Sequence, residues 1–429
     1  MFENDLRDLL FYSHKNSFYK LISGLKPLED KQEDIYDFSI CKLLQKVTER
    51  KIHSFVENLC DLTLIGREVR LQQNNRSTTR IDLLGISEAS VLNIIELKTS
   101  KKSEREAFTE LLGYANHYSL LFPGLKDSAL NSILVAPMES RITQDAFLQE
   151  ILINNKPILA LKPIHNKADQ IELQVYYPDA TIYKHFENNI VNDQSMITVV
   201  LTFNEIKGWI DTDINNAGTI PKYSKDALNT ISTMISQKLE AEGLHSIVYA
   251  SQQWGEVSKI FPLPNKITVV AINPFSSLRT STHEGVIYGA SNDDRVSAIQ
   301  SIYNQLTEEG KEDWLSYMEN GFHDRLIRIV KDVFEESIGY NQNNLKTEVR
   351  YEISIPDWYG LKINMIESVF VHNLNVFCTG LLREIISEYI KLMYLDDSEE
   401  MEKFPYKSIN NWFLVWTILE RIGSEPIYK

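Results

Sequence analysis

The chain has 429 residues and is 43% hydrophobic, which fits one large domain or two to three ordinary ones. Its net charge of −15 argues against a protein that coats nucleic acid over its whole surface. Residues 1–110 contain 17 of the 44 Lys and Arg and 18 of the 59 Asp and Glu, so the remaining 27 basic and 41 acidic residues give residues 111–429 a net charge of −14. Contact with a polyanion is therefore expected within residues 1–110, and only locally.

The cysteine and targeting patterns favour a soluble cytoplasmic protein with no membrane partner. Cys41, Cys60 and Cys378 are far apart and form no CxxC, so neither a disulfide framework nor a cysteine zinc site is indicated. The start, "MFENDLRDLL", lacks the basic and apolar pattern of a secretory signal. No stretch has the apolar length of a membrane span.

Residue periodicity in the first part of the chain predicts an α/β or α+β domain around a mixed sheet. The predicted elements, in chain order, are a helix at 34–59, two strands around the polar loop of "RLQQNNRSTTRIDLLGI", a strand at Val91–Lys98, a helix from Ser103 to about Phe122, a strand at Asn131–Pro137, a helix in "ITQDAFLQEILI" and a strand in "KPILALKPI". Ser103 and Glu106 have the spacing of a capping box, in which each side chain binds the other residue's free backbone N–H.

A polar stretch near Asn188–Ser195 predicts a boundary between domains at 1–190 and 195–429. The second domain is predicted to begin as an α/β block and to become mostly helical from about Arg295, where a further split is an option. Its predicted elements are a strand at Ile197–Phe203, a helix at about Lys225–Glu242, strands in "SIVYA", "KITVVAI" and "VRYEISI", and apolar helical elements in "VFVHNLNVFCTGLLREIISEYIKLMYL" and "NNWFLVWTILERI".

The strand at Val91–Lys98 contains the first candidate site residues. Side chains alternate along a strand, so Glu96 and Lys98 share a face with the apolar Leu92 and Ile94. A buried carboxylate is costly unless it is paired or binds a metal. The ordinary alternative is a cross-strand ion pair at a sheet edge, in which Lys98 only neutralises Glu96.

Two further groups are expected beside this pair. Asp82 lies in the preceding strand, which an antiparallel turn brings next to Glu96. The following helix carries Glu110 and Tyr114, four positions apart and therefore on one face. Two carboxylates on neighbouring strands suit Mg²⁺, which takes oxygen ligands and keeps water and phosphate for the rest. A lysine beside them can orient a water and offset charge on a phosphate.

This ordered set resembles the PD-(D/E)XK nuclease superfamily, and its NucS-like branch in particular, over residues 40–165. The resemblance rests on "LTLIGREVRLQQNNRSTTRIDLLGI" with Asp82, on "VLNIIELK" with Glu96-Leu97-Lys98, on the helix "REAFTELLGYANHY", and on "ILVAP" and "PILALKPI". It implies a restriction-endonuclease-like mixed-sheet core, followed here by the α/β block and the helix-rich C-terminal region.

The resemblance also implies roles for individual residues. Asp82, Glu96 and the Leu97 carbonyl would bind Mg²⁺ or Mn²⁺, and Lys98 would be the catalytic lysine. Glu110 stands where family members often have Gln, and this extra carboxylate either adds a ligand and a catalytic group or marks altered activity. The family also uses a Glu on the first helix.

Glu49 and Glu57 are the candidates for that first-helix carboxylate. Ile52, Phe55, Val56 and Leu59 form the apolar stripe of the helix at 34–59. At 3.6 residues per turn, Glu49 lies near one edge of the stripe and Glu57 points away from it. Glu49 is therefore predicted to be the catalytic metal ligand.

Basic residues beside the site are candidate contacts to substrate phosphates. Lys101, Lys102 and Arg105 follow the Glu96 strand, and a solvated basic turn is an equally good interpretation of them. Arg76 and Arg80 flank the polar loop, which is either a substrate-binding hairpin tip or an ordinary loop. Tyr114 either contacts the substrate or packs in a stripe with Leu111, Tyr118 and Leu121.

The predicted function is therefore Mg²⁺- or Mn²⁺-dependent hydrolysis of phosphodiester bonds by an endonuclease, with DNA favoured over RNA as the partner. Association with an acidic second domain fits a bacterial defence or repair protein. A catalytically inactive binding or assembly module is the alternative, and a nuclease gated by a C-terminal ligand sensor is another. A homodimer is compatible with the sequence.

Overall fold

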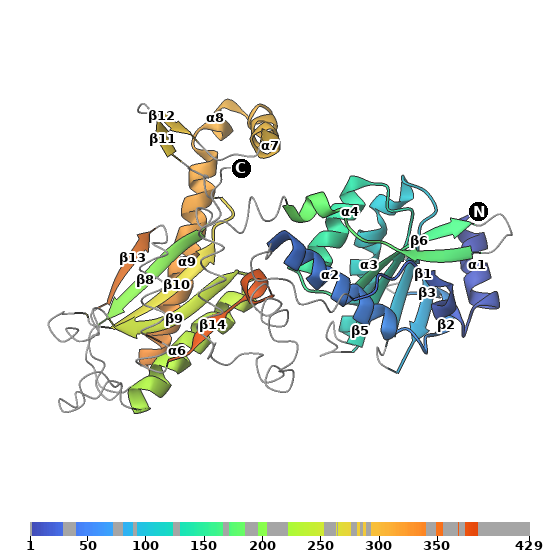
Figure 1. Ribbon diagram of the computed structural model, residues 1–429, viewed down its shortest axis with the longest axis horizontal. Coiled ribbons are helices and arrows are strands. Elements are labelled where there is room, and N and C mark those ends of the chain that lie inside the picture. The colour runs from blue at the N-terminus through green and yellow to red at the C-terminus, as the bar shows by residue number, and fades with distance from the viewer. Residues whose placement is uncertain are drawn as a thin grey trace. The chain divides into compact units, whose positions relative to one another are not determined.

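A computed structural model gives the structure of the chain (Figure 1). It describes residues 2–28, 40–71, 80–88, 92–122, 129–165, 171–184, 196–203, 222–252, 263, 265–275, 281–283, 286–288, 293–339, 349–354, 368 and 374–384. The chain divides into two compact units, one of residues 1–31 and 42–183 and the other of residues 32–41 and 184–429. The domain boundary predicted at 190–195 lies outside the described residues.

The first unit is built on a seven-stranded mixed sheet in the order β1-β7-β6-β5-β4-β3-β2. Strands β2, β3 and β4 form an antiparallel meander, β4, β5 and β6 are parallel, β7 is antiparallel to β6, and β1 is parallel to β7. The strands are β1 Ile22–Ser23, β2 Thr63–Arg70, β3 Arg80–Ile86, β4 Leu92–Leu97, β5 Leu130–Val135, β6 Ile158–His165 and β7 Ile171–Val175.

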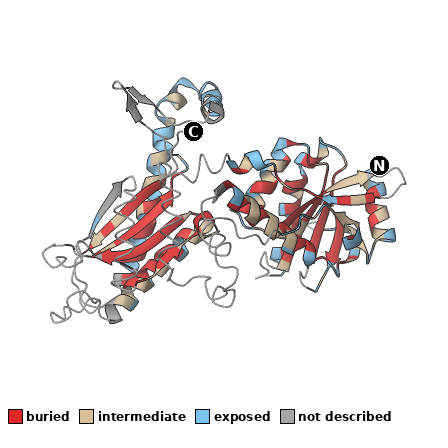
Figure 2. Ribbon diagram, in the orientation of Figure 1, coloured by how far each residue is buried: buried red, intermediate tan, exposed pale blue. Residues whose placement is uncertain are grey.

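Helices accompany this sheet and bury its central strands. Helix α1 packs against β2, β3 and β4, while α3 packs against β4 and β5. Consecutive residues of β3 and β4 are buried, which indicates cover on both faces, and Figure 2 shows these strands in red. The helices are α1 Glu3–Ser13, α2 Ile40–Glu57, α3 Ala107–Leu121 and α4 Arg141–Leu148, which continues as a π-helical turn at Gln149–Ile153.

The second unit has a five-stranded antiparallel sheet in the order β13-β8-β10-β9-β14, with α6 and α9 packed on it. Alternate residues of β8, among them Val199 and Leu201, meet Ile235 of α6 and Phe334 of α9 in one apolar core. The elements are β8 Met196–Phe203, α6 Lys222–Ala241, β9 Ser246–Gln252, β10 Asn265–Ile272, β11 Ser281–His283, β12 Val286–Tyr288, α7 Asp293–Tyr303, α8 Glu308–Lys311, α9 Trp314–Gly339, β13 Val349–Ser354 and β14 Val376–Cys378.

The mixed α/β class predicted from the sequence is confirmed by the seven-stranded sheet and the second, separate sheet. Two local predictions are wrong. Ser103 does not cap the long helix. It begins a 3₁₀ turn at Ser103–Arg105, and its side chain forms a hydrogen bond with Ser100. Helix α3 begins only at Ala107. The segment around Val376–Cys378 is a strand rather than a helix, because it pairs with β9. The predicted helix in "NNWFLVWTILERI" lies outside the described residues.

Among the helices of the described ranges, none combines the length and the apolar character that crossing a membrane requires.

A buried carboxylate joins the 3₁₀ turn after β4 to the start of α4. Glu104 is fully buried, and its Oε1 accepts the backbone N–H of Glu139 at 3.0 Å and that of Ser140, the residue before α4. The Thr143 hydroxyl also donates to the Glu104 carbonyl at 3.3 Å. This link anchors the segment that follows Lys98.

Replacing Glu104 with Ala should therefore lower the free energy of unfolding by about 1–3 kcal/mol, because the buried N–H of Ser140 and the part-buried N–H of Glu139 lose their acceptor. Urea denaturation followed by circular dichroism measures the change. Glu106→Ala is the matched control, since Glu106 is exposed and makes no capping hydrogen bond. Equal stability of the two variants would show that the link contributes nothing.

Candidate active site

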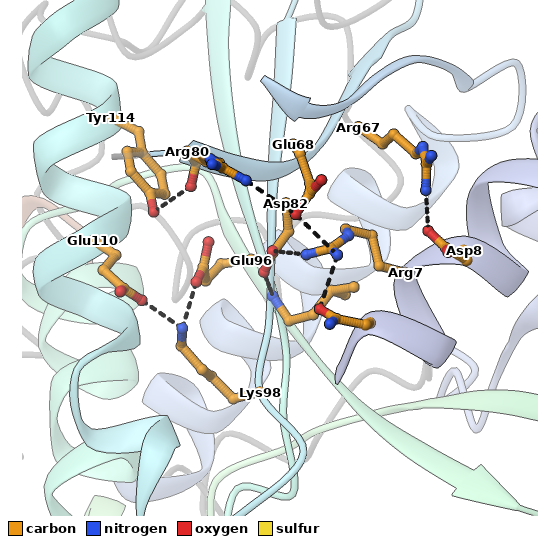
Figure 3. A network of polar contacts seen from close by, with 12 residues as sticks. Arg7, Asp8, Arg67, Glu68, Arg80, Asp82, Glu96, Lys98, Glu110 and Tyr114 are labelled. Carbon is orange, nitrogen blue, oxygen red and sulfur yellow. Dashed lines mark hydrogen bonds and ion pairs between the residues drawn. The ribbon is translucent and has the colours of Figure 1, made fainter. Parts of the chain in front are cut away.

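The meander β2-β3-β4 places Asp82 opposite Glu96. Leu83 pairs with Ile95 and Leu84 with Ile94, and one further step of this register brings the two acids face to face. Residues directly opposite in antiparallel strands share a face. The Leu97 N–H donates to Asp82 Oδ2 at 2.9 Å, so the Asp82 side chain takes the place of a ladder partner. The structure thus brings Asp82, Glu96 and Leu97 together, and Figure 3 shows the side chains of Asp82 and Glu96.

Lys98 lies between two carboxylates of this group. Its Nζ is 2.6 Å from Glu96 Oε1 and 2.6 Å from Glu110 Oε2, which α3 supplies (Figure 3). Glu96 and Lys98 are only 2% and 7% exposed, so their contact is buried, whereas the Glu110 side chain is 35% exposed. Glu110 therefore joins the site through Lys98, and the arrangement holds the lysine ammonium in a fixed position.

Burial and mutual repulsion change the acidity of these groups. The pKa of Glu96 is raised to about 10, chiefly by burial and then by the charge of Asp82 and a hydrogen bond with Glu110, while Lys98 acts in the opposite direction. Burial also raises the pKa of Asp82, although the Leu97 N–H and Arg7 oppose it. At neutral pH, in the absence of a bound cation, Glu96 consequently carries a proton.

The neighbouring acids also keep Lys98 charged. Burial by itself lowers the pKa of Lys98. At the high pH at which Lys98 titrates, Glu96 is ionised, and its charge together with the hydrogen bonds to Glu110 and Glu96 outweighs burial and raises the pKa of Lys98 above its ordinary value. An ammonium of this kind is a donor and a fixed positive charge, and it is a poor base at neutral pH.

Helix α1 adds two site residues that the sequence interpretation missed. Arg7 donates from Nη1 to Asp82 Oδ1 at 3.2 Å. Glu3 lies near the same group, since burial and the charges of Asp82 and Glu110 raise its pKa. The available signal was the i, i+4 spacing of Glu3 and Arg7 beside the buried Leu6 and Leu10, which makes the start of the chain an amphipathic helix.

Glu49 has its hydrogen-bond partners outside the group of Asp82, Glu96 and Lys98, and its role as the first-helix ligand stays a prediction. Its Oε1 accepts Lys26 Nζ at 2.7 Å and Gln45 Nε2 at 3.0 Å. Glu49 also influences the pKa of Tyr177, whose ring faces Lys26, so it belongs to a separate cluster. The apolar stripe correctly marks the buried side of α2, but it carries no information about which end of the sheet that side covers.

The predicted substrate contacts occupy different environments. Lys101, Lys102 and Arg105 are exposed directly after β4. Arg80 is also exposed, with Nη1 3.5 Å from Glu68 Oε1. Arg76 lies outside the described residues.

Tyr114 packs in the wall of the site, which favours the packing interpretation of the two that the sequence allows. Tyr114 is 3% exposed, and its hydroxyl donates to the Arg80 carbonyl at 2.8 Å. Burial and the charges of Glu96, Glu110 and Asp82 raise the pKa of this hydroxyl. The hydrogen bond ties α3 to the start of β3.

The donor set fits a hard cation that completes its shell with water. In the described part of the chain, no cluster of three or more His, Cys, Asp or Glu is arranged to hold a metal ion by itself. Asp82 and Glu96 nevertheless supply two carboxylates, and Glu96 Oε2 is buried without a hydrogen-bond donor. Mg²⁺ commonly uses one or two protein carboxylates together with waters and phosphate oxygens. Such an ion would replace the proton of Glu96.

Comparison of the chain with models of protein families, with curated proteins and with solved structures gave no match. The chemistry of the site is therefore argued from its own residues.

Glu96→Gln should make the metal-free protein less sensitive to pH. Because the folded-state pKa of Glu96 is raised to about 10, its proton stabilises the fold at low pH, and this stability is lost as pH rises from the unfolded value of 4.5 toward 10. Wild type should thus lose stability relative to the variant between pH 6 and 9, on the order of 1 kcal/mol per pH unit.

Urea denaturation in EDTA at four pH values tests this expectation. Glu57→Gln is the control, because the Glu57 side chain is 62% exposed and lies away from the site. Parallel pH profiles for wild type and Glu96→Gln would contradict a protonated Glu96.

Proposed function

We propose that the chain is a divalent-metal-dependent nuclease that hydrolyses phosphodiester bonds, with DNA as the favoured substrate. The observation that carries the proposal is the burial of Asp82 and Glu96 on adjacent strands, with Lys98 two residues after Glu96 and in contact with it. The antiparallel meander, the helix α3 and the parallel strand β5 follow one another in the order that the resemblance to PD-(D/E)XK nucleases implies.

Each residue of the site has a definite task in this proposal. Asp82, Glu96 and the Leu97 carbonyl would hold Mg²⁺ or Mn²⁺, which supplies Lewis-acid chemistry and a reactive water. Lys98 remains protonated, so it orients the attacking water and offsets charge on the phosphate. Glu110 keeps the Lys98 ammonium in place. The water oxygen bonds to phosphorus while the bond from phosphorus to the leaving oxygen breaks; the water loses a proton to solvent, and the leaving oxygen takes up a proton from solvent.

The surface around the site supports a nucleic-acid substrate. Lys101, Lys102 and Arg105 lie within seven positions of Lys98 and are exposed. The strongly acidic part of the chain beyond residue 110 repels polyanions unless it forms a local basic groove. Binding through the turn after β4 is therefore the arrangement we favour.

An inactive nuclease-like module is the second candidate function, and one observation favours it. Lys98 is held by both Glu96 and Glu110, and Asp82 is held by Arg7, so the charges of the resting site are already paired. A protein that only binds nucleic acid, or that serves in assembly, can retain such pairs for stability. Metal-dependent cleavage separates the two candidates.

Lys98→Ala should reduce cleavage by at least about 100-fold, because the ammonium is placed to act on charge in the transition state. The assay uses labelled single-stranded and duplex DNA and RNA with Mg²⁺ or Mn²⁺, and circular dichroism checks the fold. Lys20→Ala, an exposed change elsewhere in the first unit, is the control. Inactive wild type on every substrate would favour the binding module, and full activity of the variant would rule out a catalytic Lys98.

Replacing Lys101 and Lys102 together with Ala should weaken binding to all sequences and flatten its salt dependence. Each lost phosphate contact lowers the slope of log affinity against log salt by about 0.7–0.9. Titrations in Ca²⁺, which limits turnover, measure that slope. Arg328→Ala with Lys331→Ala on α9 removes the same charge from an exposed surface of the second unit. An equal effect of this control pair would place the substrate on the second unit.

A further inference from the structure

We infer that Arg7 is a built-in counter-ion of the metal site, which holds Asp82 while no divalent cation is bound and releases it to the cation when one binds. This inference rests on the proposed function, because it concerns the same cation. It gives α1 a role in controlling how readily the site is loaded. Three features of the described residues support it.

The first feature is that both oxygens of Asp82 already have partners. Oδ2 accepts the Leu97 N–H at 2.9 Å, and Oδ1 accepts Arg7 Nη1 at 3.2 Å. The backbone donor is fixed by β4, whereas the guanidinium ends a flexible side chain. A cation that binds Asp82 through Oδ1 therefore competes with Arg7, and the two positive charges repel each other.

The second feature is that Arg7 has other partners to which it can turn. Its Nη2 is 3.1 Å from Glu68 Oε1 and donates to Asn4 Oδ1 at 2.8 Å. The guanidinium side chain is only 8% exposed, and an unpaired buried charge is costly. Because Glu68 remains beside it, Arg7 can leave Asp82 without losing all its compensation.

The third feature is the backbone of Glu68. Its φ of +46° lies in the left-handed region, where residues other than glycine are uncommon. The β2-β3 register pairs Arg67 with Leu83 and Val69 with Ile81, which places Glu68 across from Asp82. Glu68, Asp82 and Glu96 thus form a row of carboxylates across three strands. A strained residue at this position indicates a role beyond strand pairing.

Removing the charge of Arg7 should change two quantities in opposite directions, namely the stability of the metal-free protein and its affinity for Mn²⁺. Arg7→Gln should lower stability in EDTA, because Asp82 loses its counter-ion. The same variant should bind Mn²⁺ at least about tenfold more tightly, which corresponds to about 1.4 kcal/mol, because the competing charge is gone. Arg7→Lys keeps the charge and should bind Mn²⁺ like wild type.

The experiment measures Mn²⁺ affinity by calorimetry and urea stability in EDTA for the full-length chain. Arg67→Gln is the matched control, since Arg67 also joins β2 to α1 but pairs with Asp8 (Figure 3). Asp82→Asn, alone and with Arg7→Gln, completes a double-mutant cycle for the metal-free pair. Non-additive stabilities are expected for this pair.

A second comparison covers the case in which Arg7→Gln does not fold. Glu68→Gln removes the alternative partner, so Arg7 should stay on Asp82 and Mn²⁺ should bind at least about tenfold more weakly. Asp8→Asn removes one negative charge from the same pair of elements and should leave the affinity unchanged. Equal affinities of Glu68→Gln and Asp8→Asn would overturn the inference.

The outcomes separate this inference from the proposed function. If wild type binds Mn²⁺ and Asp82→Asn does not, the metal site stands. Unchanged or weaker binding by Arg7→Gln then overturns the counter-ion alone. If Mn²⁺ binds to none of the proteins, the proposed metal site is wrong, and so is the release of Asp82 by Arg7 on metal binding. Additive stabilities in the metal-free cycle would show that Arg7 does not hold Asp82.

Discussion

The first unit depends on a balance of charge buried between β3, β4, α1 and α3. Carboxylates removed from water are costly, and here they are neutralised from two directions. Arg7 neutralises Asp82 from one side, while Lys98 reaches Glu96 and Glu110 on the other. A proton on Glu96 removes the negative charge that these two cations do not balance. The site is thus folded and compensated before any cation arrives.

The sheet holds these charged groups in fixed positions, because its central strands are covered on both faces. Buried apolar neighbours such as Ile94 and Ile95 hold β4 in register, and that register fixes Glu96 opposite Asp82. Helix α3 contributes Glu110 and the hydroxyl of Tyr114, which binds the start of β3. The polar contacts of the site are therefore made by strands and a helix whose other residues are packed in the apolar core.

The sequence predicts the parts of the site that local patterns determine. The apolar, β-branched runs define β3 and β4, and period-two alternation puts Glu96 and Lys98 on one face. Contacts between distant segments leave no such pattern. Arg7 is 75 positions from Asp82, and only the packing of α1 on β2, β3 and β4 reveals the pair. The contribution of Glu68 depends on a single backbone angle at a bulged strand.

Other discrepancies have similar physical causes. Ser103 has the right spacing for a capping box, but its bonds with Ser100 favour a 3₁₀ turn. The apolar run around Val376–Cys378 is compatible with a helix as well as with a strand. It forms a short strand because it pairs with the edge of β9, a tertiary contact that the local sequence does not reveal. Glu49 shows a related limit. An amphipathic stripe predicts which side of a helix is buried, but it does not predict which part of the sheet that side covers.

The charge balance also bears on which ligands the proposed site would take together. A divalent cation adds two positive charges, and displacement of the Glu96 proton removes one, so loading the site changes its charge by about +1. Lys98 stays charged throughout, because its acidic neighbours raise its pKa. A phosphodiester group brings one negative charge and oxygen ligands that Mg²⁺ accepts readily. Cation and phosphate together would therefore restore the charge balance that the resting site has through Arg7 and the proton on Glu96. The cation would then favour tight binding of the phosphate, and the phosphate would favour tight binding of the cation.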